Sequence, residues 1–109
     1  MLFYKFCLVF LQKNKYMISI NDYFDGNVKS LGYTTTNGKS TLGVMNPGEY
    51  EFGTTTHETM HIVEGSMTVK LPETSDWITF TKGESYMVDA NKTFLVKVSE
   101  QTSYLCQYK

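Results

Sequence analysis

From Met17 onward the chain consists of short apolar strings separated by clusters of turn residues. The strings are rich in Val, Ile, Thr, Tyr and Phe, and several alternate apolar with polar residues, which is typical of half-buried strands. Only Ile20–Phe24 suggests a single helical turn, and no longer stretch shows the period of a helix. We therefore expect strands at Val28–Tyr33, Ser40–Met45, Tyr50–Phe52, Glu58–Val63, Met67–Leu71, Trp77–Thr81, Ser85–Val88, Thr93–Val98 and Ser103–Tyr108.

The strings are separated by turn residues about every ten positions, a spacing typical of sandwiches and barrels. Gly, Pro, Asn and Asp dominate these turns because they accept the backbone angles that turns require. A chain of 109 residues has room for one core and one domain. We expect a single all-β domain, a closed barrel, over residues 17–109. Its turns fall at 25–27, 37–38, 46–48, 64–66, 82–84 and 89–91.

The first sixteen residues differ from the rest of the chain. Residues 2–11 are rich in apolar side chains, and Lys13 and Lys15 follow them. This stretch is shorter than the ~20 apolar residues that a membrane span needs. In a signal peptide the positive charges precede the apolar run, whereas in this stretch Lys13 and Lys15 follow it. We interpret residues 1–16 as an extension upstream of a native start at Met17; the alternative is an extra edge strand or short helix packed on the domain.

Charge and cysteine content limit the partners and the compartment. The formal net charge is −1, which gives no reason to expect a nucleic acid polymer or a membrane as partner. The sequence contains no Arg, so a phosphate contact must use Lys, hydroxyl groups or backbone amides. Cys7 and Cys106 stand near opposite ends of a chain without a secretory signal, which indicates reduced thiols and a cytoplasmic protein.

One carboxylate interrupts an otherwise apolar strand face. Glu58, Met60 and Ile62 alternate along one predicted strand, so their side chains share a face, while His61 lies on the other. Burial of a carboxylate is costly unless the group is paired or hydrogen-bonded. Glu58 is therefore expected near the mouth of the barrel or in a functional site.

The spacing of two segments resembles the motifs of the cupins. Glu58-x3-Ile62-x2-Gly65 resembles the core of the first motif, and Gly83-x5-Asp89-x-Asn91-x2-Phe94 has the spacing of the second. The resemblance implies a double-stranded β-helix, or jelly-roll barrel. At the positions where metal-binding cupins place three His ligands, this chain has Glu51, Gly53 and Phe94. We therefore expect no metal.

A closer resemblance spans about residues 19–108. The stretch Asn21–Ser30 and the terminal string Tyr104-Leu105-Cys106-x-Tyr108 are similar to those of the small bacterial pyrimidine/purine nucleoside phosphorylases, a one-domain cupin family. The resemblance implies a pentosyltransferase, or glycosyltransferase, that cleaves many purine and pyrimidine nucleosides with phosphate. The products are the free base and a pentose 1-phosphate. It also implies a homodimer, with inorganic phosphate as co-substrate and no cofactor.

Phosphorolysis needs a phosphate cradle and a group that stabilises positive charge on the sugar. For the cradle the candidates are Lys29 with Ser30, and the loop 34–41, which contains Lys39 and Ser40. The alternative for this loop is an ordinary hairpin with a solvated lysine. Glu58 is the catalytic candidate, as the acceptor of the ribose hydroxyls beneath a developing cation; the alternative is a structural, hydrogen-bonded barrel residue.

The base needs a pocket that accepts purines and pyrimidines alike. Aromatic side chains stack on any base, and Tyr50, Phe94 and Tyr104 are the candidates for this role, with Tyr108 beside them. Each of them could instead be part of the packed core, because aromatic side chains contribute much of its area.

Two other classes of function are weighed against this one. A metal-dependent cupin enzyme, such as a dioxygenase or isomerase, would need Glu58 to converge with His57 and His61. Neighbours on an extended strand point apart, and His61 lies on the opposite face, so that geometry is unfavourable. A non-catalytic cupin that binds a small ligand would use the same pocket, and no sequence feature separates it from an enzyme.

Overall fold

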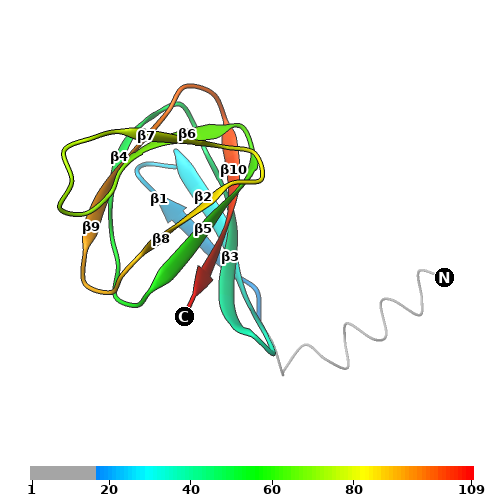
Figure 1. Ribbon diagram of the computed structural model, residues 1–109. Coiled ribbons are helices and arrows are strands. Elements are labelled where there is room, and N and C mark those ends of the chain that lie inside the picture. Colours follow the sequence, from blue (N-terminus) through cyan, green and yellow to red (C-terminus); the bar gives the residue numbers. More distant parts are fainter. Residues whose placement is uncertain (1–16) are drawn as a thin grey trace.

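The computed structural model describes residues 17–109, so the interpretation of residues 1–16, Cys7 included, falls outside the described residues. The described part contains ten strands and no helix, which confirms the all-β prediction, and it therefore offers no helix that could cross a membrane. The strands, labelled in Figure 1, are β1 (Ser19–Tyr23), β2 (Val28–Thr35), β3 (Gly38–Met45), β4 (Gly48–Gly53), β5 (Glu58–Glu64), β6 (Ser66–Lys70), β7 (Ile78–Thr81), β8 (Ser85–Val88), β9 (Thr93–Val98) and β10 (Thr102–Tyr108).

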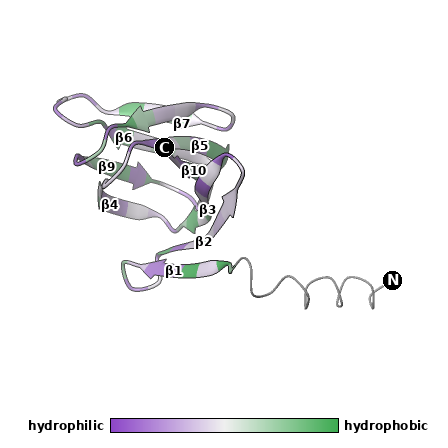
Figure 2. Ribbon diagram, turned by 90° about the horizontal axis from the view of Figure 1, so that it is seen from below, coloured by the Kyte–Doolittle hydropathy of each residue, from purple (hydrophilic) through white to green (hydrophobic). Residues whose placement is uncertain are grey.

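The strands form two antiparallel sheets. The larger has six strands in the order β1-β2-β3-β10-β5-β8, and the smaller has four in the order β4-β9-β6-β7. Viewed from below, β6 and β7 lie on the side of the domain opposite β1 and β2, with β3, β4, β5, β9 and β10 between them (Figure 2). The chain passes from one sheet to the other after β3, β4, β5, β7, β8 and β9, so the two sheets enclose a common interior.

The predicted strands are all present, with ends that shift by a few residues. The helical turn suggested for Ile20–Phe24 is wrong, because Ser19–Tyr23 forms strand β1 and pairs with β2. The strand ends where Phe24 and Asp25 adopt positive φ angles of 53° and 56°. The Asn27 amide then donates to the Phe24 carbonyl at 3.1 Å. Pairing with β2 therefore decides the conformation of Ser19–Tyr23, and the turn begins only at Phe24.

The core lies between the two sheets. Alternate residues of the strands point inward, as the period of two requires, and the smaller sheet contributes residues such as Val69 and Val96, which are fully buried. The buried apolar residues are Val28, Met45, Tyr50, Met60, Ile62, Met67, Val69, Tyr86, Val88, Phe94, Val96, Val98, Tyr104 and Cys106.

Gly65 shows why the first motif needs its glycine. It has φ +92° between β5 and β6, in the left-handed region that favours glycine, and a Cβ atom there would collide with Thr102. The Thr102 hydroxyl is buried and donates to the carbonyls of Ser66 at 3.1 Å and Glu100 at 3.0 Å. In the second motif the left-handed position is taken by Asn91 (φ 61°), a residue that tolerates this conformation.

Gly43 makes room for a tyrosine that crosses the sheet. Ser30 on β2, Gly43 on β3 and Tyr104 on β10 are register neighbours on the inner face. A Cβ atom on Gly43 would overlap the end of the Tyr104 ring. The ring therefore extends across Gly43 toward Ser30, which is near enough to lower the pKa of Tyr104.

We predict that Gly43→Ala lowers the free energy of unfolding by about 1–3 kcal/mol, because the methyl group displaces the Tyr104 ring. Gly53→Ala is the matched control, since a Cβ atom there meets nothing closer than 4.0 Å. Urea denaturation of both variants measures the difference. Equal stability of the two would show that Tyr104 does not depend on the space above Gly43.

Candidate functional site

A cavity of about 480 Å³ opens between the two sheets, and we refer to it as the central cavity. Its volume is in the range of small-molecule sites. The six-stranded sheet forms one wall, and β4 and β9 form the other; the end of β1 forms its edge. The cavity is lined by Tyr23, Phe24, Ser30, Thr41, Met45, Glu51, Phe52, Gly53, Glu58, Met60, Phe94, Tyr104, Cys106 and Tyr108.

Glu58 is the first residue of β5 and lies half-buried in the wall of the central cavity. Its register partners are Tyr108 on β10 and Val88 on β8. The thiol of Cys106, one inner-face position along β10, lies 3.6 Å from the Glu58 Oε1 atom and donates a hydrogen bond to it. The prediction that Glu58 faces inward is confirmed by this lining.

The environment of Glu58 favours its neutral form. Burial raises the pKa of the Glu58 carboxyl above its ordinary value, while the hydrogen bond from Cys106 and the charge of His57 lower it. Burial, and then the Glu58 charge, raise the pKa of the Cys106 thiol to about 12. The thiol is therefore protonated at neutral pH and serves as a donor to the carboxylate rather than as a nucleophile.

A polar row crosses the inner face of the six-stranded sheet deeper in the cavity. The Asn21 amide donates to the Ser30 hydroxyl at 3.2 Å, and Ser30 in turn meets Tyr104. Burial raises the pKa of Tyr104 to about 12, partly offset by the hydrogen bond with Ser30. These groups are neutral hydrogen-bonding partners at neutral pH, suited to the hydroxyl groups or the base of a small ligand.

Aromatic rings cover the opposite wall. Phe52 and Phe94 stack with their centroids 5.6 Å apart at 30°, and Phe24 meets Phe52 edge-on at 5.5 Å. Tyr50, a sequence candidate, is buried outside the lining of the central cavity. Its ring packs against Phe24 at 5.1 Å and its hydroxyl donates to the Asn46 carbonyl at 2.6 Å. The candidates Phe94 and Tyr104 do line the cavity.

A second hollow of about 440 Å³ adjoins the central cavity and shares Thr41 and Tyr108 with it. Many of its residues carry hydroxyl groups, and Lys39 contributes a cation, so we name it the hydroxyl hollow. It is lined by Met17, Ser19, Gly32, Tyr33, Thr34, Lys39, Ser40, Thr41, Thr55, Thr56 and Tyr108.

The sheet register connects the two sites. Lys39 on β3 pairs with Tyr108 on β10, which pairs with Glu58 on β5, so the three side chains project on the same inner face. Ser40 alternates to the other face of β3. Lys39 therefore places a positive charge in the hydroxyl hollow, on the same face of the six-stranded sheet as Glu58.

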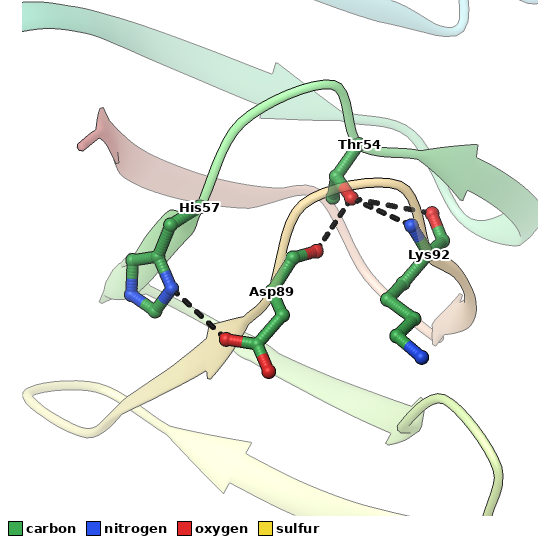
Figure 3. Close-up of polar contacts among 4 residues, drawn as sticks. All are labelled: Thr54, His57, Asp89 and Lys92. Atoms are coloured by element: carbon green, nitrogen blue, oxygen red, sulfur yellow. Dashed lines mark hydrogen bonds and ion pairs between the residues drawn. The ribbon is translucent and has the colours of Figure 1, made fainter.

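A threonine clasp holds the loop between β4 and β5 (Figure 3). The buried Thr54 hydroxyl donates to the Asp89 carbonyl at 2.6 Å and accepts from the Lys92 amide at 3.0 Å. His57 Nδ1 lies 3.3 Å from Asp89 Oδ1 in the same view. These contacts anchor both ends of the loop that carries residues 55–56 of the hydroxyl hollow and leads into Glu58.

The structure separates the four phosphate candidates. Ser30 lines the central cavity, whereas Lys39 and Ser40 line the hydroxyl hollow. Lys29 lies outside both linings, with its ammonium group 3.8 Å from Asp22 on the solvent-exposed surface. Lys29 and Lys39 therefore do not converge on one anion site.

The residues at the cupin metal positions do not fit a metal ion. Among residues 17–109 no three His, Cys, Asp or Glu side chains converge. His61 Nε2 lies 2.8 Å from Gln107 Oε1, on the sheet face opposite Glu58. His57 is directed to Asp89. The set of Glu58, His57 and His61 that a metal-dependent cupin would need is thus not assembled.

Several residues that line the two sites were not among those predicted from the sequence. Tyr23 reaches the central cavity from the end of β1, the strand that was not predicted, and Phe24 reaches it from the turn after β1. Thr55 and Thr56 belong to a loop, whose position depends on the Thr54 clasp. The turn at 25–27 was visible in the sequence, and extending its hairpin backward would have found β1.

Known structures define the class of the fold. An RmlC-like cupin from Shewanella frigidimarina superposes with a TM-score of 0.67 at 15% identity, covering 84% of this chain and 83% of its own. This likeness, together with the two sheets, shows that the domain has the cupin fold. A protein of unknown function from Vibrio parahaemolyticus is closer, with a TM-score of 0.83, 44% identity, and coverage of 85% of this chain and 99% of its own.

Sequence comparison gives the family. The family model described as pyrimidine/purine nucleoside phosphorylase matches residues 18–108. A protein named pyrimidine/purine nucleoside phosphorylase from Pseudoalteromonas atlantica is 56% identical over 92 residues, which are 84% of this chain and 99% of that protein. The chain belongs to the pyrimidine/purine nucleoside phosphorylase family.

We predict that the Glu58 carboxyl carbon, followed by NMR, titrates with a midpoint above the ordinary value for glutamate, because burial raises its pKa. Cys106→Ala removes a hydrogen bond to the charged form and should move the midpoint higher still. Cys106→Ser keeps a donor and should leave the midpoint nearer that of the wild type. An unchanged midpoint in Cys106→Ala would contradict the assigned contact.

Proposed function

We propose that this protein is a pentosyltransferase that cleaves purine and pyrimidine nucleosides with inorganic phosphate, in the cytoplasm and without a cofactor. The observation that carries the proposal is the half-buried Glu58 in the central cavity, on one inner face with Lys39 of the hydroxyl hollow. Family membership supports it. In the reaction a phosphate oxygen bonds to C1′, the C1′–N bond breaks, and its electron pair leaves with the base. The proton of the hydrogen phosphate ends on the base nitrogen.

Glu58 would bind the sugar and stabilise the positive charge that develops on it. As C1′ loses the base, positive charge develops on the ribose ring, and a carboxylate held beside the ring stabilises it. The two oxygen atoms of Glu58 can also accept hydrogen bonds from vicinal ribose hydroxyls. The Cys106 thiol fixes one of these oxygen atoms at 3.6 Å, so the carboxylate is oriented before the substrate enters.

The aromatic wall would hold the base. Phe94 and Phe52 offer ring surface without charged groups, and stacking on such a surface does not discriminate between bases. Tyr104 and Ser30 provide neutral hydrogen-bonding groups at the far side of the cavity. A site with this composition fits both purines and pyrimidines.

Inorganic phosphate would occupy the hydroxyl hollow. Lys39 offers a positive charge, and threonine and serine hydroxyls offer donors, which suits an anion in a chain without Arg. Within the described part of the chain, the lining of the central cavity contains Glu51 and Glu58 and no Lys or His. An anion is therefore better placed in the hydroxyl hollow, next to the cavity, than inside the cavity itself.

A non-catalytic binder would use the same cavity, and a direct assay separates the two functions. Uridine and adenosine are each incubated with the protein, with and without phosphate, and free base is measured. We predict phosphate-dependent release of base. Absence of release from several nucleosides would defeat the proposal.

Glu58→Gln is expected to lower kcat by roughly tenfold to a hundredfold, because the amide cannot balance charge in the transition state. Thermal stability should be kept, since the amide has nearly the shape of the carboxylate. Glu49→Gln is the control: it removes an exposed carboxylate of β4 that does not line the central cavity. Near-normal turnover of Glu58→Gln would remove Glu58 from the catalytic site.

Lys39→Ala is expected to raise KM for phosphate by roughly tenfold while KM for the nucleoside stays close to wild type, because a charge-assisted contact to the anion is lost. Lys29→Ala removes a surface lysine that lines neither hollow and serves as the control. Steady-state kinetics with phosphate as the varied substrate measures both. If Lys29→Ala had the larger effect, the phosphate site would lie at β2 instead.

We also propose that the protein is a homodimer. The register places Ile20, Leu31, Leu42 and Leu105 in one row across the outer face of the six-stranded sheet. The first three side chains are exposed, and apolar patches of this kind mark interaction sites. Five strands of about seven residues form a face of roughly 24 by 24 Å, comparable with the ~800 Å² per partner of a standard interface.

Sedimentation equilibrium is expected to give the mass of two chains. Leu42→Lys places a charge at the centre of the row and should shift the mass toward one chain, whereas Ile78→Lys, an exposed apolar residue of the smaller sheet, should not. A wild-type mass of one chain would contradict the homodimer.

A further inference from the structure

The boundary between the central cavity and the hydroxyl hollow is formed by two side chains. Among residues 17–109, Thr41 and Tyr108 are the two that line both sites. Their hydroxyl oxygens are 3.0 Å apart and share a hydrogen bond. The function proposed above assigns the nucleoside to one site and phosphate to the other, so the reacting atoms must meet beside this hydroxyl pair.

The backbone of Tyr108 is held on both sides. It is the last residue of β10, paired with Lys39 on β3 and with Glu58 on β5. The next amide, of Lys109, donates to the His57 carbonyl at 2.9 Å. With strands about 4.8 Å apart, the Cα atoms of Lys39 and Glu58 are separated by about 10 Å with Tyr108 midway. Tyr108 is therefore fixed between the cation of one site and the carboxylate of the other.

The Thr41–Tyr108 hydroxyl pair has one O–H donor that the hydrogen bond between the two groups does not use. When Tyr108 donates to Thr41, the Thr41 proton is free to bind a ligand oxygen; when Thr41 donates to Tyr108, the Tyr108 proton is shared between Cys106 and a ligand oxygen. Burial raises the pKa of Tyr108, which keeps its proton on at neutral pH. A phosphate oxygen that reaches the boundary can accept the free proton of Thr41 or Tyr108.

Neutral donors suit this position better than a cation would. A lysine between the two sites would pair with Glu58 and cancel the negative charge that the sugar requires. Hydroxyl groups bind phosphate without neutralising the carboxylate. They also separate the phosphate charge from that of Glu58, which reduces repulsion between the two anions.

We propose that Tyr108 is a catalytic residue that, with Thr41, binds the attacking phosphate at the boundary of the two sites and directs one of its oxygens to C1′. This inference rests on the proposed function. The phosphate oxygen forms the bond to C1′ as the C1′–N bond breaks, and the base nitrogen receives the proton of the hydrogen phosphate. Tyr108 keeps its own proton throughout, because its hydroxyl acts as a hydrogen-bond donor only.

The test compares Tyr108→Phe and Thr41→Val with Tyr104→Phe. Each of the first two removes a hydroxyl from the boundary and keeps the shape of the side chain. Tyr104→Phe removes a hydroxyl deeper in the central cavity, beside Ser30 and outside the hydroxyl hollow. Two readouts are used: titration calorimetry with inorganic phosphate alone, and steady-state phosphorolysis of uridine with phosphate or uridine varied.

Tyr108→Phe and Thr41→Val are each expected to weaken phosphate binding and to raise KM for phosphate about tenfold or more, as the loss of a donor to an anion implies. Tyr104→Phe should change KM for uridine and leave phosphate binding unaltered. Phosphate binding by Tyr108→Phe equal to that of the wild type would overturn the inference, as would a lack of phosphate binding by the wild type.

The two proposals fail in different ways. If the wild type binds phosphate but releases no base, the phosphorylase function is wrong, while a loss of phosphate binding in Tyr108→Phe still assigns the boundary as an anion site. If the wild type releases base and Tyr108→Phe matches it in both readouts, the phosphorylase function stands and the role of Tyr108 is wrong.

Discussion

The pairing of β10 with β3 on one side and β5 on the other is the constraint on which the site depends. This register puts Tyr104, Cys106 and Tyr108 on the inner face of one strand, next to Glu58 on one side and to Thr41 on the other. A slip of β10 by one residue would turn its three side chains, Tyr104, Cys106 and Tyr108, to the outer face. Backbone hydrogen bonds therefore fix the chemistry of the cavity as firmly as they fix the fold.

Glu58 is the part of this arrangement that opposes stability. Because its pKa is raised on folding, the folded chain binds the proton more tightly than the unfolded chain does. Protonation of Glu58 therefore stabilises the folded state fully below the ordinary pKa of glutamate. This stabilisation is lost as pH rises through the raised pKa, because the buried carboxyl group then ionises. A cavity wall that keeps such a group, with Cys106 directed at it, fits a functional role better than a role in packing.

Much of the fold could be predicted from local patterns. The alternation of Glu58, Met60 and Ile62 gave the correct inner face, and the turn residues separated the strands at the right places. Strand β1 was missed because its positions, as at Ile20, are largely exposed, so they carry little burial signal. Pairing with β2, a non-local interaction, decides its structure.

The site was harder to predict because it depends on register between distant strands. Phe94 and Tyr104 could be placed at the cavity, but the burial of Tyr50 behind Phe24 depends on packing between β4 and the β1–β2 turn. Lys29 and Lys39 look equivalent in the sequence. The pairing of Lys29 with Asp22 and the alignment of Lys39 with Tyr108 separate them, and both follow from strand pairing.

The proposed function depends on two adjoining sites, one that binds the nucleoside and one that binds phosphate. A crystal structure of the wild-type protein with a nucleoside and phosphate, solved before turnover at low temperature, tests this most directly. We predict that the ribose hydroxyls lie at Glu58, the base against Phe94, and phosphate beside Lys39 in the hydroxyl hollow. A nucleoside bound outside the central cavity, or phosphate bound at Lys29, would contradict it.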